Sequence, residues 1–396
     1  MTLHPNRRAR PRGRPWAALP LLLAVALLAA GCQQVASPQG WAAPRIADGN
    51  LYASIERGKL AALDPDDLSV LWVFPPSTDE GKKLKLEGIY AAPIVDGDTV
   101  YFGAYDDNIY ALDAANGAPI WRFKTNDPVI GALTLADGTI FAGSTDGRLY
   151  AIDTSKCTND CPPSAARTFD TGSSIWSSPL LVEDVIYVPA MDGRLHALNA
   201  GTLEPVSGFS FKVDAGLVMD PTLANDDTLL IGGLDSTLYA IDPATGDENW
   251  SFEGGNWFWG RPLVDGNTIY IADLDGNVNA LNLTKGEPLW SDAFHAEAAV
   301  RSAPLLARDT LVIVDRDGNA YGLNPEDGTR QWGPTLLGKT VLSDPLLLER
   351  TTAPSPTSDA ETASEVLIVA QGGDVCRLDP ADGSPVAALL CIEVPL

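Results

Sequence analysis

Motifs that could carry out acid–base or metal chemistry are few in this chain of 396 residues. Beyond the N-terminal apolar segment the histidines are His196 and His295, and neither has a second ligand at the spacing of a zinc site. The sequence contains no Gly-x-Ser-x-Gly elbow, no His-Glu-x-x-His motif and no Gly-x-x-x-x-Gly-Lys-Ser/Thr loop. We therefore predict no catalytic residue, no metal site and no cofactor.

Two acidic stretches resemble fragments of a calcium-binding loop, namely Asp273-Leu-Asp275-Gly-Asn277 and Asp315-Arg-Asp317-Gly-Asn319. Each lacks the spacing of the full motif and its closing Glu. Each also contains Asp-Gly between two apolar runs, which is a strong signal for a tight hairpin turn. We interpret both stretches as turns.

Cysteine use indicates an oxidising compartment. Cys157 and Cys161 are close enough in one loop to form a bridge. Cys376 and Cys391 fall on the last two expected strands, where a simple hairpin register would leave them several residues out of alignment. Zinc is the alternative for four thiols, but the chain has no Cys-x-x-Cys pair and no histidine near them. We predict two disulfides, with the second pair less well supported by its spacing.

Aromatic residues recur three positions before a proline, at Trp41, Tyr90, Trp176 and Trp259. Other aromatic residues and arginines follow closely in the same segments. Such groups bind peptides and small ligands, and they also pack between repeated units; the sequence leaves both interpretations open. The candidate binding rim consists of Trp41, Tyr90, Trp176, Trp257, Phe258, Trp259, Arg261 and Arg301.

The elements that must position these residues come from one repeated phrase. Its clearest copy runs from Val100 to Phe123 and reads as a strand, an Asp-centred turn, an alternating strand, a turn with Gly and a strand carrying Trp121. The copies are 40 to 55 residues apart, a period typical of propeller blades. Eight copies can be counted from their Leu-Asp or equivalent step, at Asp64, Asp113, Asp153, Asn199, Asp242, Asn282, Asn324 and Asp379.

Each copy divides into four strands, A to D, so we predict an all-β fold: an eight-bladed β-propeller of four-stranded antiparallel blades over residues 41–396. Strand A would line the central channel, and the D–A loops and B–C turns would share one rim. Both terminal blades contain their own four strands, so we expect no blade to be completed from the other end of the chain. Residues 350–365 are rich in Ser, Thr and Pro, and we predict a disordered insertion there.

The N-terminus predicts export. Five arginines precede an apolar run of 15 residues, Trp16 to Ala30, which is short for a membrane span. The run ends in Leu28-Ala-Ala-Gly-Cys32, which resembles the bacterial lipobox, although Ala29 stands where that pattern prefers Leu. We predict a signal peptide at 1–31, lipidation of Cys32 and a linker at 32–40. An uncleaved anchor is the alternative.

The repeat resembles that of the PQQ-like propeller family. Close copies are Gly143-Ser-Thr-Asp-Gly-Arg-Leu-Tyr-Ala-Ile-Asp153 and the stretch from Gly233 to Trp250. One branch of this family, the quinoprotein dehydrogenases, implies a cofactor in the channel, a calcium-type ion and a disulfide between adjacent cysteines, and this chain has no Cys-Cys pair. The other branch, the BamB-type assembly lipoproteins of the outer membrane, implies a lipidated propeller of similar length without catalytic activity.

We therefore expect a monomeric, non-enzymatic lipoprotein of the cell envelope that binds envelope proteins or peptide segments as a scaffold. The alternatives are a PQQ-dependent dehydrogenase and a ligand-sensing propeller. Without residues 1–31 the chain keeps 22 basic and 52 acidic residues, a net charge of −30, which disfavours nucleic acid as a partner. Membrane contact is expected through the lipid anchor alone. The basic loop at Lys82, Lys83 and Lys85 is either a docking point or a solvated loop.

Overall fold

The computed structural model divides the chain into two compact units, Met1–Ser37 and Pro38–Leu396. The structure describes residues 40, 42–55, 58–77, 84–351, 362–386 and 390–394, all in the second unit. The predicted signal peptide at 1–31, the lipidation site Cys32 and the rim residue Trp41 therefore lie outside the described residues. None of the described residues belongs to a helix that is long and apolar enough to span a membrane.

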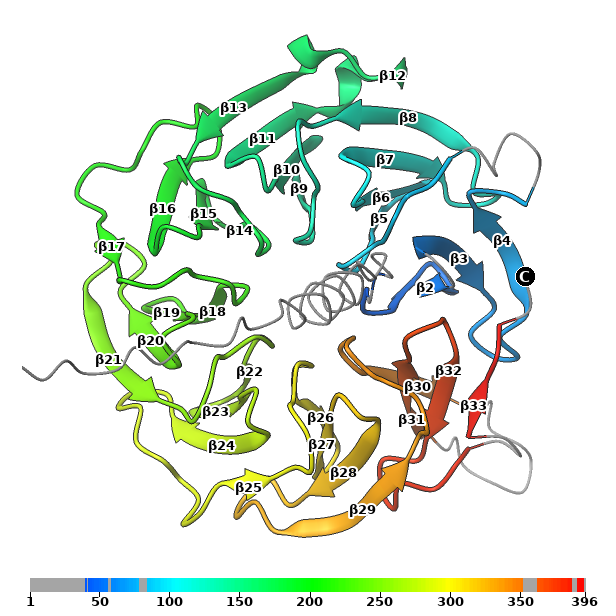
Figure 1. Ribbon diagram of the computed structural model, residues 1–396, viewed down its shortest axis with the longest axis vertical. Coiled ribbons are helices and arrows are strands. Elements are labelled where there is room, and N and C mark those ends of the chain that lie inside the picture. The colour runs from blue at the N-terminus through cyan, green and yellow to red at the C-terminus, as the bar shows by residue number, and fades with distance from the viewer. Residues whose placement is uncertain are drawn as a thin grey trace, which may run out of the picture. The chain divides into compact units, whose positions relative to one another are not determined.

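The described residues of the second unit form eight sheets arranged as a ring, with strand A of each sheet nearest the centre (Figure 1). Blades one to four comprise β1 (Arg45–Ala47), β2 (Asn50–Ile55), β3 (Lys59–Leu63) and β4 (Val70–Phe74); β5 (Ile94–Asp96), β6 (Thr99–Gly103), β7 (Asn108–Asp113) and β8 (Pro119–Lys124); β9 (Thr134–Ala136), β10 (Thr139–Gly143), β11 (Arg148–Asp153) and β13 (Ala166–Asp170); and β14 (Leu180–Val182), β15 (Val185–Pro189), β16 (Arg194–Asn199) and β17 (Phe211–Lys212).

Blades five to eight comprise β18 (Thr222–Asn225), β19 (Thr228–Gly232), β20 (Thr237–Ile241) and β21 (Glu248–Glu253); β22 (Leu263–Asp265), β23 (Thr268–Ala272), β24 (Asn277–Asn282) and β25 (Phe294–His295); β26 (Leu305–Ala307), β27 (Thr310–Val314), β28 (Asn319–Leu323) and β29 (Arg330–Leu336); and β30 (Leu346–Thr351), β31 (Thr362–Val369), β32 (Val375–Leu378) and β33 (Cys391–Ile392). The predicted eight-bladed propeller is confirmed.

Each blade consists of consecutive strands, so the expectation that neither terminal blade borrows a strand from the other end of the chain is confirmed for the described residues. One addition was not predicted. The C–D loop of blade three contains two short 3-10 helices, η3 (Thr154–Lys156) and η4 (Pro163–Ala165), and between them β12 (Asn159–Asp160). Strand β12 pairs in parallel with β8 and so gives blade two a fifth strand.

The apolar core lies between the blades. The buried residues form eight clusters, and each cluster joins the facing sides of two neighbouring blades. Strand B shows the reason: in β6, Tyr101 faces blade three while Val100 and Phe102 face blade one. Because successive strand residues point to opposite faces, a strand buried on both sides must be apolar throughout. The cluster containing Leu51 and Leu367 closes the ring between blades one and eight.

The Leu-Asp step of each repeat shapes the C–D turn. The side chain of Asp113 accepts a hydrogen bond from the backbone N–H of Ala115, at 2.9 Å, and Asp242 accepts one from Ala244, at 2.7 Å. Asp and Asn can both make this local bond, which is why either residue serves at the step. The backbone carbonyl of the next residue, here named the turn carbonyl, remains available to the preceding blade.

Strand D tryptophans bind the turn carbonyl of the following blade. The indole N–H donates from Trp72 to Ala114, from Trp250 to Leu283, from Trp290 to Pro325 and from Trp332 to Pro380, at 2.8, 2.8, 3.1 and 2.9 Å. The ring also lies against the glycine that ends the same turn. A Cβ on Gly383 would come within 2.4 Å of the Trp332 ring, so the turn requires glycine there.

Other donors replace tryptophan where the repeat lacks it. In blade three Arg167 pairs with Ala151, the position that Trp holds in other blades, and its guanidinium donates to the turn carbonyl of Ala200. In blade four the Tyr187 hydroxyl donates to the Pro243 carbonyl at 2.6 Å. Repeats three and four carry no tryptophan on strand D, and these replacements were not predicted.

Blade eight reaches blade one through arginine. Arg350 donates to the turn carbonyl of Pro65 at 2.6 Å, and Arg377 donates to the Asp66 carbonyl at 2.9 Å. Both guanidinium groups bind Glu365, whose side chain is 6% exposed; the Arg377 Nη2–Glu365 Oε2 distance is 2.6 Å. The ring therefore closes through a buried ion network between strands A, B and C of blade eight.

This network corrects the prediction of a disordered insertion at 350–365. Residues 350 and 351 belong to β30, residues 362–365 belong to β31, and the two strands pair as far as Thr351↔Thr362. The hairpin extends this far because Arg350 and Glu365 are part of the buried closure. Residues 352–361 lie outside the described residues.

Both predicted disulfides are present. Cys157–Cys161 lies in the C–D loop of blade three, with Cα atoms 4.3 Å apart. Cys376–Cys391 joins directly opposed residues of β32 and β33, with Cα atoms 3.9 Å apart, so the expected misalignment is wrong. The simple register fails because both Val386 and Leu390 hydrogen-bond to the backbone of Arg377, so counting residues from the turn does not give the pairing of Cys391.

The glycine that faces tryptophan can be tested by substitution. Gly383 and Gly49 both have positive φ, but a Cβ on Gly49 would meet nothing within 4 Å. We expect Gly49→Ala to cost about 1 kcal/mol of unfolding free energy, because both positions need a left-handed backbone. Gly383→Ala should cost about 1–3 kcal/mol more through overlap with Trp332. Urea unfolding followed by circular dichroism measures both, and equal losses would contradict the proposed contact.

The ring closure can be tested at its carboxylate. Glu365→Gln leaves the buried Arg377 guanidinium without its charge partner, whereas Arg350 keeps its contact with Asp66 at 3.2 Å. We expect a loss of about 3–5 kcal/mol in unfolding free energy. Asp160→Asn is the matched control, because the Arg122–Asp160 pair is exposed and such pairs contribute about 0–1 kcal/mol. Similar urea midpoints for both variants would show that the closure does not depend on the network.

Candidate functional site

The D–A loops enclose a cavity of about 360 Å³ at the centre of the ring. Its wall is built from the starts of strand A, where a residue precedes proline or, in blade three, Leu133. Blades one to three contribute Ala43, Ala92 and Ala132, whereas blades four, five, six and eight contribute Ser178, Asp220, Arg261 and Asp344. At these positions the wall is apolar in blades one to three and polar or charged in the other four, and Arg45 of blade one adds a charge on the first side.

Five of the predicted rim residues line this cavity, namely Tyr90, Trp176, Trp259, Arg261 and Arg301. They come from four D–A loops, with Trp259 and Arg261 on the same loop, as the repeat spacing predicted. Trp257 lies on the same loop as Trp259 but does not line the cavity, and it is 40% exposed. Trp176, at the cavity wall, is 37% exposed.

The inclusion of Phe258 in the rim is wrong. Phe258 is fully buried in the core between blades five and six, where its ring lies 6.4 Å from that of Phe252. Three consecutive aromatic residues in an extended loop cannot all face one side, because successive side chains alternate. Trp257 and Trp259 therefore point away from the core, and Phe258 points into it.

The two cavity aspartates tie neighbouring blades together. Asp220 accepts from both the backbone N–H and the hydroxyl of Ser178, at 2.7 and 2.9 Å. Asp344 accepts from the backbone N–H of Ala303 at 2.7 Å. Burial raises the pKa of Asp344, and the nearby Arg261 guanidinium opposes this shift, its Nε lying 3.8 Å from the carboxylate.

Two of the arginines that line the cavity, Arg261 and Arg301, stand on consecutive blades. Arg301 lies over the ring of Trp259, with its Cζ 4.4 Å from the ring centroid, which is a cation–π geometry. Burial lowers the pKa of Arg301, and the charge of Arg316 adds to the effect. The side chain of Arg261 is 62% exposed. The backbone at Gly260 lies close enough to the Arg301 and Ser302 carbonyls that a Cβ would meet them at 2.8 Å.

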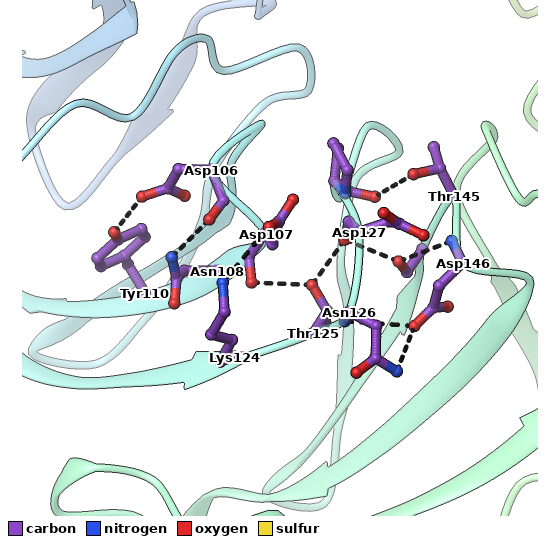
Figure 2. Close-up of polar contacts among 12 residues, drawn as sticks. Asp106, Asp107, Asn108, Tyr110, Lys124, Thr125, Asn126, Asp127, Thr145 and Asp146 are labelled. Atoms are coloured by element: carbon purple, nitrogen blue, oxygen red, sulfur yellow. Dashed lines mark hydrogen bonds and ion pairs between the residues drawn. The ribbon is translucent and has the colours of Figure 1, made fainter.

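The loops around the cavity are held by polar contacts. Figure 2 shows those of the D–A loop after blade two: the Thr125 hydroxyl lies 2.9 Å from the Asp107 carbonyl and 2.7 Å from that of Asp127. Asn126 donates to the Asp146 carboxylate at 3.2 Å, and Thr145 donates to the Pro128 carbonyl at 3.2 Å. These bonds join the loop to the B–C turns of blades two and three, so this part of the rim is preorganised.

The stretches that resemble calcium loops are turns, as interpreted. Asp273 is fully buried, and its two oxygens accept from the backbone of Asp275, Asn277 and Gly255 and from the Asn277 amide, at 2.8 to 3.0 Å. The Asp315 carboxylate is used in the same way. Among the described residues, no group of three His, Cys, Asp or Glu side chains is placed to hold a metal ion.

A second cavity was not predicted. It measures about 310 Å³ and lies on blade four. The short strand D of this blade, β17, pairs with β16 at Arg194 and Leu195 alone. His196 lines the cavity, and its ring packs edge-on against Phe169 at 5.4 Å. The Nε2 atom is buried without a hydrogen-bond partner among the described residues. Two features of repeat four in the sequence point to this cavity. Its strand D has no tryptophan, and His196 stands where strand C of other repeats has Tyr.

The geometry defines an eight-bladed β-propeller of PQQ-like repeats whose candidate site lies at the D–A rim. The family model described as outer membrane protein assembly factor BamB matches residues 56–202, 167–346 and 234–389. The chain belongs to this family.

Curated relatives fall into two groups by name. An outer membrane protein assembly factor BamB of Burkholderia pseudomallei is 27% identical over 53% of this chain and 57% of its own length. A quinoprotein alcohol dehydrogenase PedH of Pseudomonas putida is 25% identical over 68% of this chain and 43% of its own length. The match thus spans about half of each relative. The crystal structure of BamB from Moraxella catarrhalis has a TM-score of 0.64 at 18% identity, covering 84% of this chain and 92% of that one, which supports the fold.

The cavity does not fit the quinone cofactor and ion that a resemblance to quinoproteins implies. Its described carboxylates, Asp220 and Asp344, bind Ser178 and Ala303 of neighbouring blades and do not converge on one point with a third ligand. The Cys157–Cys161 bridge lies in a C–D loop and the Cys376–Cys391 bridge joins strands C and D, so neither disulfide lines the cavity.

The burial of His196 predicts a pH dependence of stability. Burial lowers its pKa from 6.5, so between that value and the lower folded-state pKa the unfolded chain binds more protons. The contribution of His196 to the unfolding free energy should thus fall as pH is lowered below about 6.5. His196→Tyr keeps an aromatic ring and removes this part of the slope, whereas the control His295→Tyr, at an exposed position, should leave it unchanged. Urea midpoints from pH 7.5 to 5 measure the slope.

Proposed function

We propose that this protein is a non-enzymatic lipoprotein of the cell envelope that acts as a protein-binding scaffold, similar to BamB-type assembly factors. The observation that carries the proposal is the match of the family model over most of the propeller. The proposed location also depends on the signal peptide and on Cys32, which lie outside the described residues. Two disulfides are consistent with an oxidising compartment.

The D–A rim is the proposed binding surface. It presents Trp176 and Trp257, which are among the exposed large apolar residues, beside Arg261. Tryptophan and arginine are the residues that most often dominate binding energy at protein interfaces. The loops that carry these tryptophans are held to B–C turns, because the Ser174 hydroxyl donates to the Thr145 carbonyl at 2.7 Å and the Asn256 amide donates to Asp275 at 2.7 Å. Little conformational entropy need therefore be lost on binding.

A quinone-dependent dehydrogenase is the second candidate, because a quinoprotein relative matches with an identity close to that of the BamB relative. A direct test separates the two. The purified protein is titrated with PQQ and calcium and assayed with a dye acceptor and alcohols. Stoichiometric PQQ binding with alcohol-dependent dye reduction would overturn the scaffold proposal.

Capture of envelope proteins should depend on the exposed tryptophans. We expect Trp176→Ala combined with Trp257→Ala to weaken cross-linked capture from envelope extracts by at least tenfold, because anchors of this kind each contribute about 2 kcal/mol or more. The control is Leu71→Ala combined with Leu336→Ala, which removes apolar side chains that are 50% and 65% exposed on strand D of blades one and seven.

Both double variants should retain the circular dichroism spectrum and urea midpoint of the parent. Deletion of 352–361 should leave capture unchanged; the deletion must not include Glu365, which belongs to the ring closure. Equal capture by the parent and the tryptophan variant would place the binding surface elsewhere, and unfolding of that variant would assign the tryptophans to packing.

A further inference from the structure

We propose that the central cavity is a recognition pocket for a carboxylate side chain of a partner peptide, with Arg261 and Arg301 as the groups that bind it. The inference rests on the proposed function, since the peptide belongs to a protein docked at the D–A rim. It extends that function by naming the chemistry that the partner must present.

The charge balance of the cavity carries the first step. Three arginines line it, Arg45, Arg261 and Arg301, against two aspartates. Both aspartates already accept hydrogen bonds from neighbouring blades, at Ser178 and Ala303. A chain with a net charge of −25 thus keeps an excess of positive charge at the centre of its ring, where low-dielectric walls strengthen the field.

The position of the guanidinium groups carries the second step. Arg301 is held against Trp259, so its charge is fixed at the cavity wall. Arg261 contacts Asp344 through Nε at 3.8 Å, which is longer than a hydrogen bond, and its side chain is largely exposed. The planar fork of an arginine matches the two oxygens of a carboxylate. An incoming carboxylate can therefore bind Arg261 without breaking a short ion pair.

The remaining walls favour a peptide over a free inorganic ion. The rest of the lining is largely apolar and includes alanines from blades one to three together with Tyr90, Trp176 and Trp259. A volume of about 360 Å³ lies at the small end of the range of ligand pockets, roughly 300–1,000 Å³. The space suits a few residues of a loop in which an apolar or aromatic side chain stands next to Asp or Glu.

The test uses the full chain and defined peptides. Acetyl-Ala-Phe-Asp-Ala-amide is titrated by calorimetry against its neutral counterpart, acetyl-Ala-Phe-Asn-Ala-amide, and against acetyl-Ala-Ala-Asp-Ala-amide. We expect the Asp peptide with Phe to bind at least tenfold more tightly than either of the others. Raising the salt concentration from 50 to 500 mM should weaken the binding of the Phe-Asp peptide, because the attraction is between charges.

Variants assign the site. Arg261→Gln should reduce affinity for the Phe-Asp peptide at least tenfold, and because Arg261 is exposed this variant should fold normally. Arg301→Gln should do the same, with circular dichroism as the check on folding. The control Arg122→Gln removes a guanidinium from an exposed pair on the outer strand of blade two and should leave affinity unchanged.

Equal binding of the Asp and Asn peptides, or an equal loss with Arg122→Gln, would overturn the proposal. Binding of inorganic phosphate or citrate as tightly as the Phe-Asp peptide would assign the cavity to small anions instead. The titration needs no envelope extract, so its outcome is independent of the capture experiment. Peptide binding without capture of envelope proteins would support the carboxylate pocket and contradict the scaffold function. Capture without peptide binding would support the scaffold function and contradict the pocket.

Discussion

The hydrogen bond from a side chain of one blade to the turn carbonyl of the next is the interaction on which the ring depends. In the described residues it occurs at seven of the eight blade interfaces, with Trp, Arg or Tyr as the donor. A single four-stranded sheet with two apolar faces cannot bury them alone. The bond fixes the distance and angle at which the next sheet must stack, while the apolar cluster between the blades supplies the burial.

The interface between blades two and three shows what happens when the turn changes. There the C–D connection contains η3, β12 and the Cys157–Cys161 bridge in place of a turn that ends in glycine. The two cysteines pack in the same cluster as Trp121, and β12 pairs with β8. A longer loop, closed by a disulfide, thus covers the tryptophan that a glycine turn covers elsewhere.

Contact between blades is made mainly along the strands and at the outer turns, and the inner ends of strand A differ from blade to blade. Blades one to three and blade seven have alanine there, whereas the other four have Ser178, Asp220, Arg261 and Asp344. The acidity of the chain has another origin: Asp serves the C–D turns, the B–C turns and the buried hairpin bonds of Asp273 and Asp315. The net charge therefore reflects turn chemistry, whereas the cavity reflects a local choice of residues.

The sequence by itself determined the number of blades, the order of strands, the turns and the D–A placement of the aromatic residues. Each of these depends on local patterns: alternation along a strand, Asp-Gly at hairpins and one phrase repeated eight times. The sequence also predicted the Cys157–Cys161 bridge, because two cysteines four positions apart in a loop must lie close to each other. The direction of Phe258 was decided by the tertiary structure, because which of three adjacent rings enters a core depends on the blade that packs against it.

The same holds for the closure of the ring and for the cavity. Arg350, Glu365 and Arg377 are 12 to 27 positions apart, and their partners Pro65 and Asp66 lie near the other end of the chain. No local pattern connects such residues, and a Ser- and Thr-rich segment next to them reads as an insertion. The alignment of Cys376 with Cys391 depends on the bonds of both Val386 and Leu390 to Arg377, which a simple hairpin register does not predict. Only the folded ring brings charges from several blades to one point, since contacts between distant residues depend on how whole sheets stack.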